Sequence, residues 1–306
     1  MTAPPPITPG SIVVAVDGSE HADRAVEWAT EQAALERRPL TVVNAAGEGE
    51  ARNAAWASLE GNLYAMPELL RASRATVDAA VERAHQVQPA LTIETRALVG
   101  DPRQVLVDMS AQAHMIVMGS RGRGAFRSMF LGSVSAAVSK HAACPVVVCR
   151  PGSPDTLTHG VVVGADGSPE SLPVIEFAFK LASQRRLRLT AVHCYFDAAA
   201  AVAAVDELPQ GNEGPDAQAD LRLLLSESVA GLSEKYPDVE VSLRLAHGLV
   251  DEGLPTLADQ AALTVVGHHH GHPMRRWWAG AMATAILERS HGTVVVVPEA
   301  EDTEGT

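Results

Sequence analysis

The sequence predicts an α/β protein made of two copies of one domain, each a five-stranded parallel sheet flanked by helices. Two observations lead to this fold class. Short runs of β-branched residues alternate with longer helical patterns, and strands that are apolar throughout are typical of a parallel sheet buried on both faces. The chain also repeats itself at an offset of 148–149 residues, a period that indicates a duplicated domain instead of a solenoid unit.

The repeat is clearest where a strand runs into Asp-Gly-Ser. Ile12–Ser19 aligns with Val161–Ser168. Between the copies, Arg150–Gly160 is rich in Pro, Gly, Ser and Thr, which indicates a linker. We therefore expect one domain over residues 1–152 and a second over residues 153–306.

Five strands are expected in the first copy, each a short apolar run. They cover Ile12–Val16, Leu40–Asn44, Leu91–Ala97, Met115–Met118 and Pro145–Val148. A helix is expected after Ser19, its N-cap, because apolar residues follow at helical spacing. Later helices are expected around Val105–Met109 and Val134–His141, and Ser168-Pro169 predicts the matching helix start in the second copy.

Net charge and apolar runs restrict the partners of this chain. The net charge is −13, which argues against duplex nucleic acid as a partner, and nearly all of the acidic excess follows residue 152. No apolar run reaches the roughly 18 residues that span a bilayer, so no membrane partner is expected. Met1–Pro9 lacks the basic and apolar regions of a secretory signal, and the expected location is the cytoplasm.

The three cysteines, Cys144, Cys149 and Cys194, do not make a disulfide framework. Cys144 and Cys149 bracket one apolar run, and no C-x-x-C spacing exists. We interpret all three as small core residues.

A glycine-rich segment follows the fourth expected strand, at the end of the sheet where parallel sheets bind ligands. It reads Gly119-Ser120-Arg121-Gly122-Arg123-Gly124. Nine residues separate Gly122 from Gly132-Ser133-Val134, which opens a helix. Glycines allow positive φ and close approach of a ligand, and free N–H groups in such a loop and at a helix N-terminus bind anions. With neutralising charge from Arg121, Arg123 and Arg127, the segment predicts a polyphosphate site.

Two further residues have both a binding and a structural interpretation. Asp17 follows the first strand and can face ribose hydroxyls or a Mg²⁺ ion between phosphates, but a plain Asx turn also explains an Asp before Gly-Ser. Val43, on the second strand, can offer its backbone to an adenine edge. Arg121 and Arg123 are either phosphate contacts or solvated loop charges.

This arrangement resembles the universal stress protein family, and the resemblance covers both repeats nearly end to end. ATP-binding members carry G-x-x-G, nine residues, then G-(S/T), which Gly119, Gly122, Gly132 and Ser133 reproduce. The family's acidic residue after the first strand matches Asp17. The Gly100-Asp101-Pro102 segment and the close at His141–Val146 also look like the family.

The resemblance implies two tandem Rossmann-like domains of the adenine nucleotide alpha hydrolase-like type, paired as a pseudo-dimer. It also implies bound ATP, possibly with Mg²⁺, at a site in the first copy. The residues expected to bind it are Ala15, Asp17, Val43, Gly100, Gly119, Ser120, Arg121, Gly122, Arg123, Gly132, Ser133 and Val134.

The second copy departs from this pattern. Gly267 and Gly280 keep their separation, but His270 stands in place of Gly122 and Ala281 in place of Ser133. An imidazole at position 270 is expected to block the backbone conformation that Gly122 can adopt. The site is therefore predicted to be degenerate, and its remaining candidate contacts are Asp166, Gly248, Gly267 and Gly280.

The tract His268-His269-His270-Gly271-His272 invites a metal interpretation, because imidazoles bind Zn²⁺, Ni²⁺ or Cu²⁺. Neighbours on one loop seldom converge on one ion, so a degenerate phosphate loop is the preferred interpretation and no metal site is expected. Trp277-Trp278 is either an interface anchor or an apolar lid over the decayed site.

The family resemblance implies a cytoplasmic regulatory protein that couples adenine-nucleotide level to a stress or growth response, and not an enzyme. A weak ATPase is the rival from the enzyme class, but no lysine or paired carboxylate accompanies the loop to assist phosphoryl transfer. A ligand-free interaction scaffold is the other alternative. The downstream protein partner is not identified by the sequence.

The final strand of each copy is expected at a sheet edge, and exposed apolar edges invite pairing. The two copies are therefore predicted to pair within one chain, with a homodimer of tandem chains as an optional further step. Residues 1–152 expressed alone should dimerise or aggregate, because the fragment's edge has lost its partner. Light scattering measures this, and a stable dilute monomer would contradict the predicted pairing.

Overall fold

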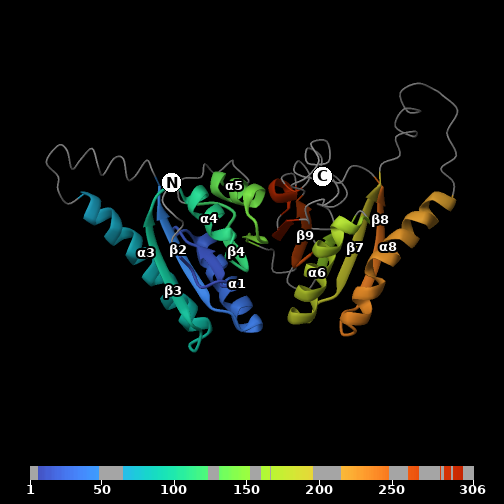
Figure 1. Cartoon of the computed structure of the whole chain (residues 1–306), viewed down its shortest axis with the longest axis horizontal. Helices are drawn as coiled ribbons and strands as arrows, with labels where there is room; N and C mark the ends of the chain where they lie inside the picture. Colours follow the sequence, from blue (N-terminus) through green and yellow to red (C-terminus); the bar gives the residue numbers. More distant parts are fainter. Residues whose placement is uncertain are drawn as a thin grey trace, which may run out of the picture. The chain divides into compact units, whose positions relative to one another are not determined.

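The computed structural model describes residues 6–47, 65–122, 131–151, 160–165, 167–195, 215–247, 261–268, 283, 286–290 and 292–298. The chain divides into two compact units, Met1–Pro151 and Gly152–Thr306 (Figure 1). No helix in these ranges is long and apolar enough to cross a membrane.

The first unit holds a parallel sheet whose strands match the expected ones closely. They are β1 (Ile12–Ala15), β2 (Leu40–Ala46), β3 (Ile93–Val99), β4 (Met115–Gly119) and β5 (Val146–Cys149). The strand order within the unit is β3-β2-β1-β4-β5, with Ile12 opposite both Leu40 and Met115. The predicted α/β class is thus confirmed, and β3 lies two residues later than predicted.

Four helices cover the sheet in the described part of the first unit. They are α1 (Glu20–Glu36), α3 (Ala65–Val87), α4 (Pro102–Ser110) and α5 (Ser133–His141). The chain runs from β1 outward to β3, then returns to β4 and β5, so right-handed crossovers place helices on both faces. Accordingly, α1 packs with α3 and α4 packs with α5. Figure 1 shows α3 running alongside β2 and β3.

Helix α1 begins where the sequence predicts. Ser19 is its N-cap, and the Ser19 hydroxyl accepts a hydrogen bond from the backbone N–H of Ala22 at 3.3 Å. The apolar stripe Ala22, Ala25, Val26 and Ala29 is buried against the sheet. The helix ends at Arg37, which takes a left-handed conformation with φ 52°.

The second unit repeats the sheet with the order β8-β7-β6-β9-β10. The strands are β6 (Val161–Gly164), β7 (Leu189–Tyr195), β8 (Val241–His247), β9 (Leu263–His268) and β10 (Thr293–Pro298), and the described helices include α6 (Leu172–Arg185) and α8 (Pro215–Lys235). Ser168 precedes a short 3₁₀ turn, Pro169–Ser171, and its side chain makes no capping hydrogen bond. The helical turn thus begins at Pro169 after Ser168 as predicted, but it is a 3₁₀ turn, and α6 begins three residues later.

Burial predicts which leucines stabilise the first unit. Leu40, on β2, is fully buried, whereas Leu35, on α1, is 48% exposed. Leu40→Ala should lower the free energy of unfolding by about 2–5 kcal/mol, because the cavity it leaves adds to the lost transfer energy. Leu35→Ala, the matched control, should cost below about 0.5 kcal/mol in a urea titration. Equal losses for the two variants would contradict the described core.

Candidate functional site

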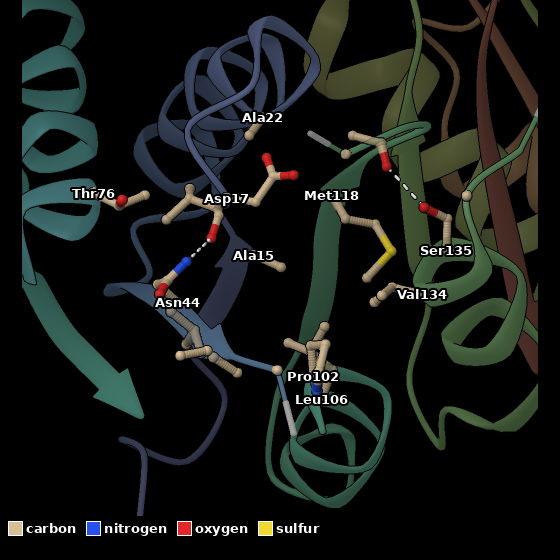
Figure 2. Close-up of a pocket in the computed structure, with 18 of the residues that line it drawn as sticks. Ala15, Asp17, Ala22, Asn44, Thr76, Pro102, Leu106, Met118, Val134 and Ser135 are labelled. Atoms are coloured by element: carbon tan, nitrogen blue, oxygen red, sulfur yellow. Dashed lines mark hydrogen bonds between the residues drawn. The ribbon is translucent and has the colours of Figure 1, made fainter. Parts of the chain in front are cut away.

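Successive strands of the first unit are added on one side of β1 (β2, then β3) and afterwards on its other side (β4, then β5), so β1 lies between β2 and β4. Doubly wound sheets bind ligands beyond the carboxyl ends of the strands at such a switch point. A cavity of about 540 Å³ opens there, within the size range of small-molecule sites. Figure 2 shows side chains from the strand ends and from α1, α3, α4 and α5 around it.

The Asp-Gly-Ser turn after β1 forms one wall of the cavity. The Asp17 carboxylate accepts a hydrogen bond from the Ser19 backbone N–H at 3.0 Å, so the Asx turn is present. Gly18 has φ 76°, a left-handed conformation that favours glycine. Asp17 also lines the cavity, beside Ala22 in Figure 2. The two interpretations of Asp17 are thus compatible with one another.

The glycines of the loop after β4 are needed for space and not for backbone conformation. Gly119, Gly122 and Gly132 do not have positive φ, so that part of the predicted reason for them was wrong, while the close approach of a ligand stays a prediction. A Cβ on Gly119 would lie 2.7 Å from the backbone of His21, where α1 crosses the end of β4. A Cβ on Gly122 would overlap the Asp17 carboxylate. Each glycine therefore permits a close approach that any side chain would prevent.

Helix α5 directs its N-terminus at the cavity. Gly132 is its N-cap, and the Gly132 N–H donates to the Ser120 carbonyl at 2.8 Å, so it is not an open donor as the sequence had suggested. The next N–H groups, at positions 133–135, lack intrahelical partners by helix geometry. All three residues line the cavity, and the Ser135 hydroxyl ties the helix to Gly119 by donating to its carbonyl at 2.8 Å. The backbone N–H groups of this helix terminus are therefore available to donate hydrogen bonds to a ligand in the cavity.

Arg121 adds positive charge to the same end of the cavity. It is a lining residue, and its Nε is buried with no hydrogen-bond partner among the described residues. The Ser19 hydroxyl donates to the Arg121 carbonyl at 3.4 Å, which ties the loop to the start of α1. An anion at the α5 terminus would supply the acceptor that this guanidinium lacks. Arg123 and Arg127 lie outside the described residues.

His21 stays close to this charged end. Burial lowers the pKa of His21, and the positive charges of Arg121 and Arg24 lower it further. Its ring Nδ1 lies 3.4 Å from the Ser120 hydroxyl. The positive charge contributed here at neutral pH is therefore that of the arginine, with the imidazole neutral.

The opposite wall comes from β2 and α3, and the sequence analysis named Val43 there but neither Asn44 nor any residue of α3. The Asn44 side-chain amide donates to the Val16 carbonyl at 2.6 Å, and the Ser73 hydroxyl donates to the Asn44 side-chain oxygen at 2.5 Å. Val43 lines the cavity as predicted, but its carbonyl already accepts the Val16 N–H at 2.8 Å. The buried residues of α3 are Ser73, Val77, Ala80 and Ala84, which recur at helical spacing. A test for helical periodicity over a longer stretch of sequence would have predicted this helix.

The far end of the cavity is mainly apolar. Its lining residues there include Ala45, Ala46, Leu69, Ala72, Pro102 and Leu106. Ala15, Ser133 and Val134 also line the cavity, whereas Gly100 and Ser120 are not among the lining residues. Gly100 instead donates its N–H to the Ala46 carbonyl at 2.9 Å. The site combines an end that carries a guanidinium and a helix N-terminus with an apolar slot.

Few of the second-copy predictions fall on described residues. Gly267 lies on β9 opposite Val297, and His268, the first of the histidine tract, is 5% exposed at the end of that strand. Asp166, Gly248, Gly280, Ala281, residues 269–272 and Trp277-Trp278 lie outside the described residues. No group of three or more metal-ligating side chains occurs within the described ranges.

The cysteines are free thiols: Cys144 and Cys149 are buried and Cys194 is half-buried. Burial raises the pKa of Cys144 to about 12 and that of Cys194 to about 11. Both thiols therefore stay protonated near neutral pH, as core residues do.

These features define a class: a duplicated, doubly wound α/β protein with a cavity at the switch point of its first sheet. The chain belongs to the Universal stress protein family, which matches it over residues 10–150 and again over 158–298. The tandem organisation of the family match thus follows the internal repeat.

Several relatives share this organisation over nearly their whole length. Universal stress protein Rv2005c of Mycobacterium tuberculosis is 34% identical over 296 residues, which cover 93% of this chain and 96% of that protein. A universal stress protein of Mycolicibacterium smegmatis is 31% identical over 94% of this chain and 96% of its own length. The crystal structure of a universal stress protein from Archaeoglobus fulgidus shares the fold, with a TM-score of 0.65, 17% identity and coverage of 96% and 97% of the two chains.

The close approach at Gly119 can be tested by stability. Gly119→Ala should lower the free energy of unfolding by about 1–3 kcal/mol, because the new Cβ forces α1 away from β4. Gly47→Ala is the matched control, since nothing lies within 4 Å of a Cβ there. Chemical denaturation of both variants measures the difference. A Gly119→Ala protein as stable as the control would contradict the described packing of α1 on β4.

Proposed function

We propose that the first unit binds ATP and that the chain acts as a regulatory nucleotide sensor in stress or growth control. The single observation that carries this proposal is the pairing of the buried, unpartnered Arg121 Nε with the open N-terminus of α5 at one end of a 540 Å³ cavity. That combination suits a polyphosphate better than a neutral ligand. Family membership supports the regulatory role.

The residues of the cavity suit the three parts of ATP. The N–H groups at positions 133–135 and Arg121 would hold the phosphates. Asp17 would contact the ribose hydroxyls, or a Mg²⁺ ion if one accompanies the phosphates. The apolar slot, which is lined by Leu69, Pro102, Leu106 and the end of β2, would take the adenine ring.

The cavity favours binding over hydrolysis. Among the described lining residues, Asp17 is the one carboxylate and Arg121 the one cation. Phosphoryl transfer depends on positioned metal ions, a water-orienting group and several charges around the transferred phosphoryl. We therefore propose a non-catalytic role. The cytoplasmic location and a possible homodimer of tandem chains stay predictions from the sequence.

The nucleotide content of the purified protein tests the proposal directly. Mass spectrometry after denaturation should find stoichiometric ATP, and calorimetry on nucleotide-free protein should recover its binding. ADP that accumulates under turnover would favour an ATPase. Protein that neither carries nor binds a nucleotide would favour an interaction scaffold and contradict the proposed function.

Three substitutions should weaken ATP binding without unfolding the chain. Asp17→Asn keeps an oxygen acceptor for the Asx turn but removes the charge, and Arg121→Ala removes the guanidinium. Each should weaken binding about 10–100-fold, the usual scale for a hydrogen bond to a charged group. Gly122→Val should act similarly because its side chain would overlap Asp17.

The control for these variants is Arg244→Ala, which removes the same charge from the exposed surface of β8 in the second unit. Its ATP affinity should stay within about twofold of the unmodified chain. Isothermal titration calorimetry at one fixed salt concentration compares the four variants with the unmodified chain. Unchanged affinity for the three cavity variants would place the ATP site elsewhere.

A further inference from the structure

The duplicated chain provides a comparison between two versions of one cavity wall. The glycine of the turn that leaves the first strand has the same left-handed conformation in both units: Gly18 has φ 76° and Gly167 has φ 79°. In both units, a polar side chain of the second strand also contacts the backbone carbonyl at the end of the first strand. The Asn44 amide donates to the Val16 carbonyl, and the ring Nδ1 of His193 lies 3.0 Å from the equivalent carbonyl of Ala165.

The wall that faces this turn differs between the units. Helices α3 and α8 both end six residues before the strand that follows them. Counted back from that strand, Leu224 of α8 occupies the position of Thr76 in α3, and the buried Leu225 matches the buried Val77. Thr76 lines the cavity of the first unit, and its hydroxyl is turned back onto the Ala72 carbonyl at 3.1 Å.

Leu224 packs directly on the turn of the second unit. A Cβ built on Gly167 would overlap both the Cγ and a Cδ of Leu224. The leucine side chain therefore occupies the space over Gly167, which keeps its left-handed conformation beneath it. In the first unit, the threonine side chain ends one atom closer to the backbone than leucine does and leaves Asp17 facing the cavity.

We infer that the residue at this helix position, Thr76 in the first unit and Leu224 in the second, determines which unit admits the nucleotide. Threonine leaves the space beside Asp17 open to the ligand, and leucine closes the matching space in the second unit. The chain accordingly takes one nucleotide, in its first unit. This inference rests on the proposed function for its ligand but on the described packing for its mechanism.

The first test moves the leucine into the first unit of the full-length chain. Thr76→Leu should weaken ATP binding about tenfold or more, because the added carbons fill ligand space. Ala79→Leu is the matched control, since Ala79 is exposed on the same helix and is not a lining residue. The control should keep its affinity, and thermal unfolding of both variants should match. Calorimetry on the unmodified chain should give one ATP per chain.

Two results of this first test would overturn the inference. One is a Thr76→Leu protein that binds ATP as tightly as the control. The other is a stoichiometry of two ATP molecules per unmodified chain.

A second test needs no ligand, so it decides the inference even if the chain binds no ATP and the proposed function fails. Gly167→Ala forces alanine into a left-handed conformation, and its Cβ also meets Leu224. Gly167→Ala should therefore lower the midpoint of thermal unfolding more in the unmodified chain than in a chain that carries Leu224→Thr, where the strain of the left-handed alanine remains but the overlap is relieved. An equal effect of Gly167→Ala in the two backgrounds would show that leucine does not fill the space over Gly167.

Discussion

The chain leaves β1 through a turn that must bring a helix back across the sheet within a few residues. Gly18 makes that turn possible with its left-handed backbone, the Asp17 carboxylate fixes it by accepting the Ser19 N–H, and Ser19 then caps α1. Because α1 starts there, it crosses β4 at Gly119, where a Cβ has no room. The position of the cavity, and of the loop that follows β4, depends on this one turn.

The strands and the start of α5 were predictable from the sequence, because their signals are local. Apolar runs bounded by turn residues located the five described strands of the first unit to within two residues. The nine-residue spacing placed Arg121 and the start of α5 at one cavity. The helix α3 was missed, since its buried face includes Ser73 and several alanines, which give a weak apolar pattern.

The reasons for individual residues were less predictable than their positions. The glycines at 119 and 122 were expected to need positive φ, but they need the space taken by His21 and by the Asp17 carboxylate. Those neighbours come from α1 and its preceding turn, about a hundred residues earlier in the chain. Sequence spacing cannot reveal which backbone will cross a glycine. Asn44 was overlooked for the same reason, because its function depends on the Val16 carbonyl of an adjacent strand.

The hydrogen bond from the Gly132 N–H to the Ser120 carbonyl has a consequence for how this protein can vary. It joins the two ends of the segment that links β4 to α5, at 2.8 Å. The scaffold thus holds the helix in place by a short stem, and the stem needs no particular number of residues between its ends, because loop length changes closure entropy only slowly. A fixed length of that segment among related chains would therefore not be explained by the fold and would point to binding by the segment itself. Insertions and deletions within it would then report selection for binding separately from selection for the fold.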